Sequence, residues 1–198
     1  MTARAIRAVL RHPAAMAVKR RVQDGIWTLK GRRLANPALP IPVRSLVFVC
    51  LGNICRSPFA EHLARQQLAA AGVASVRVSS AGISASQDIG VPQAGREMAR
   101  RHFDLALELH RPQRLSRTVV DGHDLLVVME AGQFFRLREE YPHAANRIVL
   151  LSLFDPTPER TFERYHIDDP YGHPAQDFLR CYRRIDRAVA QLLGAVTR

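Results

Sequence analysis

One short segment of the sequence combines a nucleophile, a fixed positive charge and a tight turn. Cys50 is followed after five residues by Arg56, and Gly52 and Asn53 lie between them. Glycine and asparagine tolerate positive φ more readily than other residues, so the backbone N–H groups of such a loop can converge on one point. A guanidinium group matches phosphate oxygens in a bidentate fashion. The segment therefore predicts a loop that binds a tetrahedral dianion next to a cysteine thiol.

The surroundings of this loop would favour the thiolate form of Cys50, which is the nucleophilic form of cysteine. A neighbouring guanidinium group and the N-terminus of a helix both stabilise a thiolate. Ser57 follows closely enough to donate a hydrogen bond to the sulfur, whereas we expect Asn53 to brace the loop rather than touch substrate. A thiolate held beneath the phosphorus of an ester predicts covalent attack at phosphorus.

The segments around this loop alternate between strand and helix patterns. Residues 45–50 form a continuous apolar run, typical of a parallel strand buried on both faces, and further strands are predicted at 75–80, 124–129 and 147–151. Helices are predicted between Ser57 and Gly72 and at residues 92–102, 131–140 and 175–193. This order predicts an α/β fold in which an open, parallel, four-stranded sheet has helices on both faces. The phosphate-binding loop follows the first strand, at the edge where such sheets bind ligands.

The helix after the loop has its own start and stop signals. Ser57 is predicted as its N-cap, Pro58 as its first residue and Gly72 as its C-terminal stop. A helix that begins there would direct its positive end at the loop.

Length and composition predict one domain of ordinary size. The chain has 198 residues, of which 47% are hydrophobic and 24% charged, and this excludes disordered, collagen-like and coiled-coil classes. Three cysteines are too few for a disulfide framework, and a loop that needs free thiols favours the reducing cytoplasm. No apolar run approaches the roughly 20 residues of a membrane-spanning helix.

The net charge of +11 is concentrated near the N-terminus. Residues 1–45 contain ten Lys or Arg and one acid, Asp24, and so carry +9. The remainder is close to neutral, which disfavours nucleic acid as a partner. Three prolines in residues 36–42 predict an extended linker. We therefore divide the chain into a basic N-terminal extension with a Pro-rich linker, residues 1–44, and a domain, residues 45–198.

The basic extension matches no common targeting signal. Its best apolar run, residues 14–18, is too short for a secretory signal, and no serine precedes Ser45 as an organelle transit peptide would require. Short amphipathic helices, broken at Pro13, could contact the membrane surface or an acidic partner. The alternative is a solvated extension with no fixed partner.

The run from Val49 to Pro58 resembles the phosphate-binding loop of the low-molecular-weight protein tyrosine phosphatases. The similarity extends over about residues 45–195 and includes Ser80-Ala81-Gly82, His110, residues 124–129 and Asp169-Pro170-Tyr171. The resemblance implies a phosphatase that works through a phosphocysteine intermediate and uses no metal or other cofactor. It implies that Cys50 and Arg56 are catalytic and that the phosphate site is formed by Leu51, Gly52, Asn53, Ile54, Cys55 and Ser57.

The resemblance also supplies the acid that the chemistry needs. A leaving phenolate takes up a proton, the water that attacks next gives one up, and one carboxyl group can serve both steps. Asp169 matches the family's acid, in a loop stiffened by Pro170, with Tyr171 as an aromatic wall for the substrate ring. Asp168 and Asp155 remain alternatives for the acid.

Three other side chains can be explained by a structural role as well as by a functional one. Cys55 resembles the family's second thiol and could form a protective disulfide with Cys50, or it is simply a small loop residue. Cys181 is expected in the core, on an amphipathic helix. His110 matches a family histidine and is expected to brace the loop, and the histidines show no metal-ligand spacing.

Two other functions are weighed against phosphatase activity. An arsenate reductase on the same scaffold would need two more cysteines after the third strand, and residues 128–133 contain none. A non-catalytic phosphate-binding module would not require Cys50 and Asp169 together. Within the family, phosphoarginine-specific members carry Thr where this chain has Ile54, and the apolar Ile54 favours the flat ring of phosphotyrosine.

Two departures from the eukaryotic type of the family indicate a subfamily. Ile83 and Gly172-His173-Pro174 look like the bacterial phosphatases that act on tyrosine autokinases controlling polysaccharide export. The resemblance thus implies a phosphotyrosine protein as substrate and a membrane-bound tyrosine kinase as partner.

Overall fold

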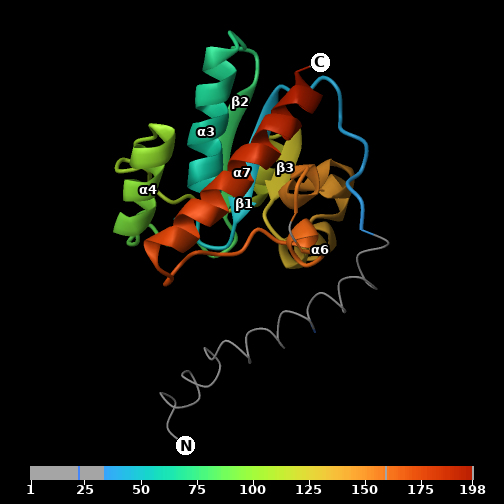
Figure 1. Cartoon of the computed structure of the whole chain (residues 1–198). Helices are drawn as coiled ribbons and strands as arrows, with labels where there is room; N and C mark the ends of the chain where they lie inside the picture. Colours follow the sequence, from blue (N-terminus) through green and yellow to red (C-terminus); the bar gives the residue numbers. More distant parts are fainter. Residues whose placement is uncertain (1–21, 23–33, 159, 198) are drawn as a thin grey trace, which may run out of the picture.

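Four parallel strands form the sheet at the centre of the molecule (Figure 1): β1 (Ser45–Cys50), β2 (Arg77–Gly82), β3 (Leu125–Val128) and β4 (Ile148–Leu150). The structure, a computed structural model, describes residues 22, 34–158 and 160–197. The strands lie in the order β2-β1-β3-β4, so β1 is central and its carboxyl end opens between two neighbours. Every residue of β1, β3 and β4 is buried, as expected for strands covered on both faces.

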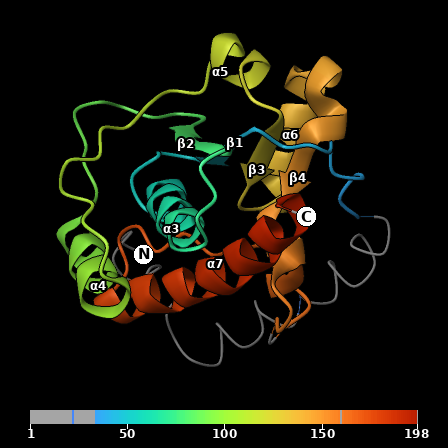
Figure 2. The same cartoon turned by 90° about the horizontal axis from the view of Figure 1, so that it is seen from above.

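Helices cover both faces of the sheet, as predicted (Figure 2). On one face lie α3 (Arg56–Ala70) and α7 (Ala175–Val196), with α4 (Gln93–Phe103) packed beside α7. On the other lie α5 (Arg117–Asp121) and α6 (Ala131–Glu140). Short 3-10 helices follow in the second half of the chain: η2 (Pro142–Arg147), η3 (Leu151–Phe154) and η4 (Glu163–Tyr165).

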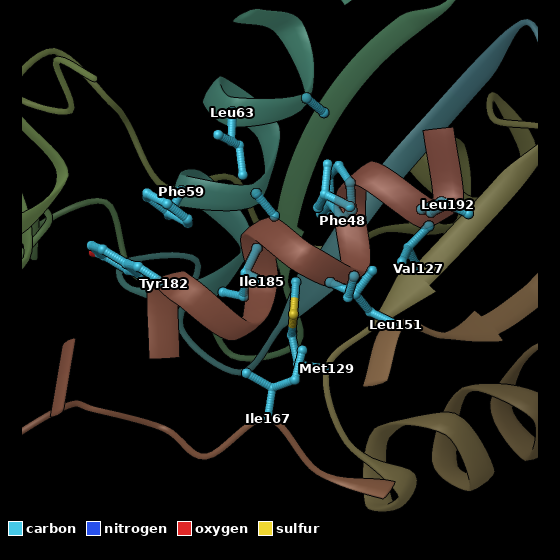
Figure 3. Packing of buried hydrophobic residues seen from close by; sticks show 14 of the residues in the cluster. Phe48, Phe59, Leu63, Val127, Met129, Leu151, Ile167, Tyr182, Ile185 and Leu192 are labelled. Carbon is cyan, nitrogen blue, oxygen red and sulfur yellow. The ribbon is translucent and has the colours of Figure 1, made fainter. Parts of the chain in front are cut away.

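The larger hydrophobic cluster fixes α3 and α7 against the sheet, and thereby fixes the start of α3 (Figure 3). Phe59 of α3 stacks on Tyr182 of α7, with ring centroids 3.8 Å apart and planes 2° from parallel. Alternate residues of β1 point to this cluster, among them Phe48, while Val47 and Val49 point to the smaller cluster under α5 and α6. None of the described helices is both long and apolar enough to cross a bilayer.

Most predicted elements are confirmed, with ends shifted by one to three residues. The second strand was expected at 75–80 but lies at Arg77–Gly82, because Ala81 and Gly82 continue the ladder opposite Val49 and Cys50. The helix at 131–140 has the predicted ends, and the C-terminal helix runs three residues further, to Val196. The short helices α5, η2, η3 and η4 were not predicted.

The prediction that Ser57 caps α3 is wrong. The helix begins at Arg56 with Cys55 as N-cap, and no side chain caps it. Pro58 is consequently its third residue rather than its first, which the helix tolerates because the first turn has no intrahelical partners for its N–H groups. Gly72 follows the helix with φ of +70°, the left-handed conformation of the predicted C-terminal stop.

The segment expected as a linker lies on the domain from Leu34 onward. Leu34 is buried in the smaller cluster, and Val43 is buried in the larger one. The Asn36 side chain accepts a hydrogen bond from the backbone N–H of Leu150 at 2.7 Å and donates one to its carbonyl at 3.1 Å. Asn36 thus provides hydrogen-bond partners for backbone groups at the outer edge of β4, where a neighbouring strand would otherwise pair. The predicted helices within residues 1–33 lie outside the described residues, apart from Val22.

Candidate active site

The loop between β1 and α3 turns back tightly over the end of the sheet. Asn53 has φ of +54°, which this residue type adopts more easily than most, whereas Gly52 does not use the left-handed region. The loop also lies directly on Gly82 at the end of β2, because a Cβ there would sit 2.8 Å from the Asn53 nitrogen and 2.9 Å from the Leu51 oxygen. Any other residue at position 82 would displace the loop.

The Asn53 side chain braces the loop from within. Its Nδ2 donates to the hydroxyl oxygens of Ser57 and Ser80, both at 2.8 Å. Its Oδ1 accepts from the backbone N–H of Gln113 at 2.8 Å. The His110 ring lies beside it, with Nε2 at 3.0 Å from the Asn53 carbonyl oxygen. These contacts join the loop to three other parts of the chain. Burial of the His110 ring lowers its pKa.

Two donors surround the sulfur of Cys50. The Asn53 backbone N–H donates to Sγ at 3.2 Å, and the Ser57 hydroxyl lies 3.0 Å from Sγ. The Ser57 hydroxyl oxygen already accepts from Asn53 Nδ2, so its own proton is available to the sulfur or to the Ala81 carbonyl at 3.3 Å. Hydrogen bonds of this kind favour a thiolate over a thiol.

A cavity of about 240 Å³ opens beside Cys50. Its walls come from the loop after β1, the loop after β2 and the segment before α7, and the lining residues are Cys50, Leu51, Gly52, Ile54, Cys55, Ser84, Ser86, Ile89, Asp169 and Tyr171. Most of the exposed lining surface is apolar. Leu51, Ile89 and Tyr171 are about half exposed, as expected for side chains at the rim of a binding site.

Arg56 is buried to 1% exposure and reaches toward the acid loop. Its Nη2 lies 2.5 Å from Asp169 Oδ2, and its Nη1 donates to the Ile167 carbonyl at 3.0 Å and to Glu130 Oε1 at 3.3 Å. Burial by itself lowers the pKa of Arg56, but the Cys50 sulfur and the two carboxylates outweigh burial and raise it.

One donor of Arg56 has no protein partner within the described part of the chain. Its Nε is buried and makes no hydrogen bond. Leaving a buried donor unpaired costs about 1–3 kcal/mol, and more for a charged group. An oxygen of a bound anion would remove this cost, so the unpaired Nε indicates a place for a ligand rather than a packing feature.

Asp169 is the carboxylate that the structure brings to the cavity. It lines the cavity, and its Oδ1 accepts from the Tyr171 backbone N–H at 3.1 Å. Asp168 is exposed and does not line the cavity. Asp155, the other alternative, is buried with Arg184 and Arg187 at a different place. Of the three candidates, only Asp169 meets the cysteine and the arginine.

The other two cysteines differ from Cys50 in their surroundings. All three cysteines are free and buried. Burial raises the pKa of Cys55, with the nearby Asp169 and Cys50 adding to the effect, so Cys55 stays a protonated thiol. Burial raises the pKa of Cys181 to about 12, consistent with its predicted place in the core.

Several site residues were not predicted from the sequence. Glu130 and Gln133 support Arg56, since Gln133 Nε2 donates to Glu130 Oε1 at 2.6 Å. Glu61 accepts from the Ser80 hydroxyl behind the loop, at 2.5 Å. Glu130 follows the third strand, at the carboxyl edge where ligands bind, and this position was the available signal. Glu61 lies one turn after Ser57 on the same helix face, a spacing that also could have indicated it.

The described ranges contain no group of three or more His, Cys, Asp or Glu side chains that could hold a metal ion. The polar side chains that line the cavity are those of Cys50, Cys55, Ser84, Ser86, Asp169 and Tyr171, and Arg56 contacts Asp169 beside it.

Comparisons with known proteins identify the family of this chain. The family model described as "Low molecular weight phosphotyrosine protein phosphatase" matches residues 45–198. The chain is 32% identical over 148 residues to the probable low molecular weight protein-tyrosine-phosphatase EpsP of Ralstonia solanacearum, covering 74% of this chain and 92% of the relative. It is 31% identical over 152 residues to the low molecular weight protein-tyrosine-phosphatase Wzb of Escherichia coli K12, covering 77% and 95%.

Solved structures show the same fold. The tyrosine phosphatase amsI of Erwinia amylovora superposes with a TM-score of 0.68 at 26% identity, covering 79% of this chain and 95% of the other. The tyrosine phosphatase Wzb of Escherichia coli K30, solved with sulphate, gives 0.67 at 26% identity, covering 77% and 97%. The match to the family model spans the sheet, the loop after β1 and the segment that carries Asp169. This chain therefore belongs to the low molecular weight protein tyrosine phosphatases, a family of hydrolases that also has the bacterial members above.

Proposed function

We propose that this chain hydrolyses phosphotyrosine in proteins, with Cys50 as nucleophile, Arg56 as phosphate ligand and Asp169 as general acid and base. The observation that carries the proposal is that Cys50 and Asp169 line one cavity and that Asp169 contacts Arg56, although Asp169 lies more than a hundred residues from the loop that holds the other two. Each group alone has a structural explanation. Together they are the nucleophile, anion ligand and proton donor of a phosphoester hydrolase.

The proposed reaction has two steps. The Cys50 sulfur attacks phosphorus, an S–P bond forms as the P–O bond to the phenol breaks, and Asp169 gives its proton to the leaving oxygen. Water then attacks the phosphocysteine, Asp169 takes a proton from it, and the S–P bond breaks to release phosphate and the thiolate. The backbone N–H groups of the loop after β1 and the unpaired Nε of Arg56 receive the phosphoryl oxygens throughout.

Asp169 occupies one of the hydrogen-bond donors of Arg56. Arg56 Nη2 donates to Asp169 Oδ2 at 2.5 Å. A dianion in the loop carries more charge than one carboxylate and takes over this guanidinium.

The apolar lining of the cavity supports a phenolic substrate. Ile54 and Ile89 form part of the walls, with Tyr171 at the rim. A flat ring buries its faces against such side chains, whereas the guanidinium group of phosphoarginine would lose its hydration without a matching acceptor. The expected preference is for phosphotyrosine over phosphoserine and phosphoarginine.

Turnover of three peptides that differ only in the phosphorylated residue tests this function. We expect kcat/KM for phosphotyrosine to exceed those for phosphoserine and phosphoarginine by at least about 10-fold, the usual scale of discrimination by an apolar pocket. Equal or faster turnover of either competitor would contradict the assignment. The absence of any turnover would favour a non-catalytic phosphate-binding module, and arsenate reduction would favour a reductase.

We also propose that the protein works in the cytoplasm, on a membrane-bound bacterial tyrosine autokinase of polysaccharide export. Ile83 and Gly172 are the sequence features that support this class of substrate. Residues 1–33 hold nine Lys or Arg and one acid, a charge that draws the enzyme to an anionic membrane surface at about 1 kcal/mol per base near the surface. Screening by salt weakens this attraction.

Deletion of residues 1–33 is expected to abolish salt-sensitive binding to vesicles that contain anionic phospholipid. The deletion ends before Leu34 and Asn36, so the contacts with β4 remain and hydrolysis of a small aryl phosphate stays unchanged. Co-sedimentation at low and at physiological ionic strength measures the binding, with neutral vesicles as the control. Equal binding of the full and truncated chains would disprove the membrane role, and binding to an isolated kinase but not to vesicles would move the target to that protein.

A further inference from the structure

Arg184, in the middle of α7, connects three separate parts of the chain that lead to Asp169. Its Nε donates to Asp155 Oδ2 at 3.1 Å, its Nη2 to the Glu163 carbonyl at 2.6 Å and its Nη1 to the His166 carbonyl at 2.7 Å. The side chain is only 13% exposed. Each of its three nitrogens thus has a partner, and the planar guanidinium holds the three partners at fixed relative positions.

Asp155 fixes Arg184 in turn. Its side chain is fully buried, and its two oxygens accept from Arg184, Arg187 and the Thr157 backbone N–H. Burial by itself would raise the pKa of Asp155, but the hydrogen bonds from Arg187, Thr157 and Arg184 outweigh burial and lower it. The carboxylate is therefore charged under working conditions and anchors the guanidinium group in one orientation.

The backbone that Arg184 holds runs directly into the catalytic acid. His166 lies three residues before Asp169, and the next residue, Ile167, is held from the sheet side. The Ile167 N–H donates to the Met129 carbonyl at 2.9 Å, and its carbonyl accepts from Arg56 Nη1 at 3.0 Å. Arg184 and Arg56 therefore fix neighbouring peptide groups from opposite sides. Among the described residues, the hydrogen-bond partners of the Asp169 side chain are Arg56 and the Tyr171 N–H.

We infer that Arg184 is a positioning residue for the reaction, which sets the place of the Asp169 carboxyl group through the backbone of residues 163–166. The inference rests on the proposed function, because it assumes that Asp169 is the acid. Misplacement of a catalytic group by about 1 Å costs on the order of 10²-fold in rate. Arg184 does not line the cavity, so we expect its effect on the rate to pass through the segment that carries Asp169.

Arg187 provides the matched control for Arg184. Both arginines lie on α7 and bind Asp155, and Arg187 does so through Nε at 3.0 Å and Nη2 at 3.1 Å. Within the described part of the chain, Arg187 makes no hydrogen bond to the backbone before Asp169, whereas Arg184 makes two. In either single variant, Asp155 keeps one arginine as partner, so no buried charge is left alone.

The test compares Arg184→Met with Arg187→Met on aryl phosphates whose leaving phenols range from acidic to as basic as tyrosine. Arg184→Met is expected to lower kcat about 10–100-fold for the most basic phenol and less than about 3-fold for the most acidic one, because only a basic leaving group depends on the acid. Arg187→Met is expected to leave this leaving-group dependence as in the wild type. Arg184→Lys keeps the charge but not the three-way geometry, and it is expected to resemble Arg184→Met.

A double variant separates this inference from the proposed function. In an Asp169→Ala background, Arg184→Met is expected to cause no further loss with the basic phenol, since both changes act on the same proton transfer. If Asp169→Ala alone leaves the leaving-group dependence unchanged, the proposed acid is wrong. Three results would overturn the positioning role if Asp169→Ala does change this dependence. Arg184→Met could lower kcat equally for all substrates, it could lower kcat further in the Asp169→Ala background, or it could leave kcat unchanged. Should Arg184→Met not fold, the same comparisons with Arg184→Lys decide the outcome.

Discussion

Replacement of Cys50 by serine is expected to lower the turnover of aryl phosphates by about 10³-fold or more, which corresponds to at least about 4 kcal/mol of transition-state stabilisation. The reason is that a hydroxyl is a far weaker nucleophile than a thiol unless a base activates it, whereas the cysteine sulfur has the Asn53 N–H and the Ser57 hydroxyl as hydrogen-bond partners. The oxygen of serine is smaller than sulfur, so the fold and the affinity for inorganic phosphate are expected to remain. Steady-state kinetics and phosphate binding by calorimetry measure the two effects separately.

The other two cysteines are the controls for this prediction. Cys55→Ser and Cys181→Ser remove buried thiols that are protonated and that the reaction does not use. Cys55→Ser is expected to keep most of the activity while making oxidative inactivation harder to reverse. More than a few per cent of wild-type turnover in Cys50→Ser, or a comparable loss in Cys181→Ser with the fold intact, would contradict a covalent mechanism at Cys50.

The parts of the site that follow one another in the sequence could be predicted from it. The apolar run of β1, the turn at Asn53 and the arginine at the start of α3 lie within one segment, Ser45–Arg56, so their spacing alone indicates an anion-binding loop after a buried strand. The parallel sheet could also be predicted, from the alternation of strand and helix patterns, because connections between parallel strands are usually helices that cover the faces of the sheet. Asp169 lies over a hundred residues away, and it was the family resemblance that connected it to this loop.

Contacts across the fold could not be predicted, because they depend on which elements become neighbours. Arg56 was predicted as a phosphate ligand, but its contact with Glu130 was not predicted, and this contact exists because β3 lies next to β1. Ser57 was expected both to cap α3 and to donate to the Cys50 sulfur; its hydroxyl does lie 3.0 Å from the sulfur, but it does not cap the helix, which begins one residue earlier, at Arg56. Similarly, the docking of Asn36 on β4 requires an edge strand whose order in the sheet no local pattern gives.

Replacement of Asp169 by alanine is expected to lower kcat for phosphotyrosine by about 10²–10⁴-fold, the usual contribution of general acid catalysis. The loss should shrink for esters of acidic phenols, whose leaving oxygens need no proton. Asp169→Asn is the more conservative variant, since its amide oxygen can still accept from the Tyr171 N–H. It removes both the proton for transfer and the negative charge that pairs with Arg56. Measurement of kcat against the acidity of the leaving phenol separates loss of the acid from loss of the loop's shape.

The neighbouring carboxylate supplies the control for Asp169. Asp168 is exposed and lies outside the cavity, so Asp168→Ala removes the same charge one residue away and is expected to leave kcat within about 2-fold of the wild type. The two variants differ only in whether the carboxylate reaches Arg56 and the cavity. If Asp168→Ala and Asp169→Ala lower kcat by the same factor, the effect comes from the charge of the loop rather than from proton transfer. If Asp169→Asn loses equally for every leaving group, the proton comes from another residue, and Asp169 serves only as the resting partner of Arg56.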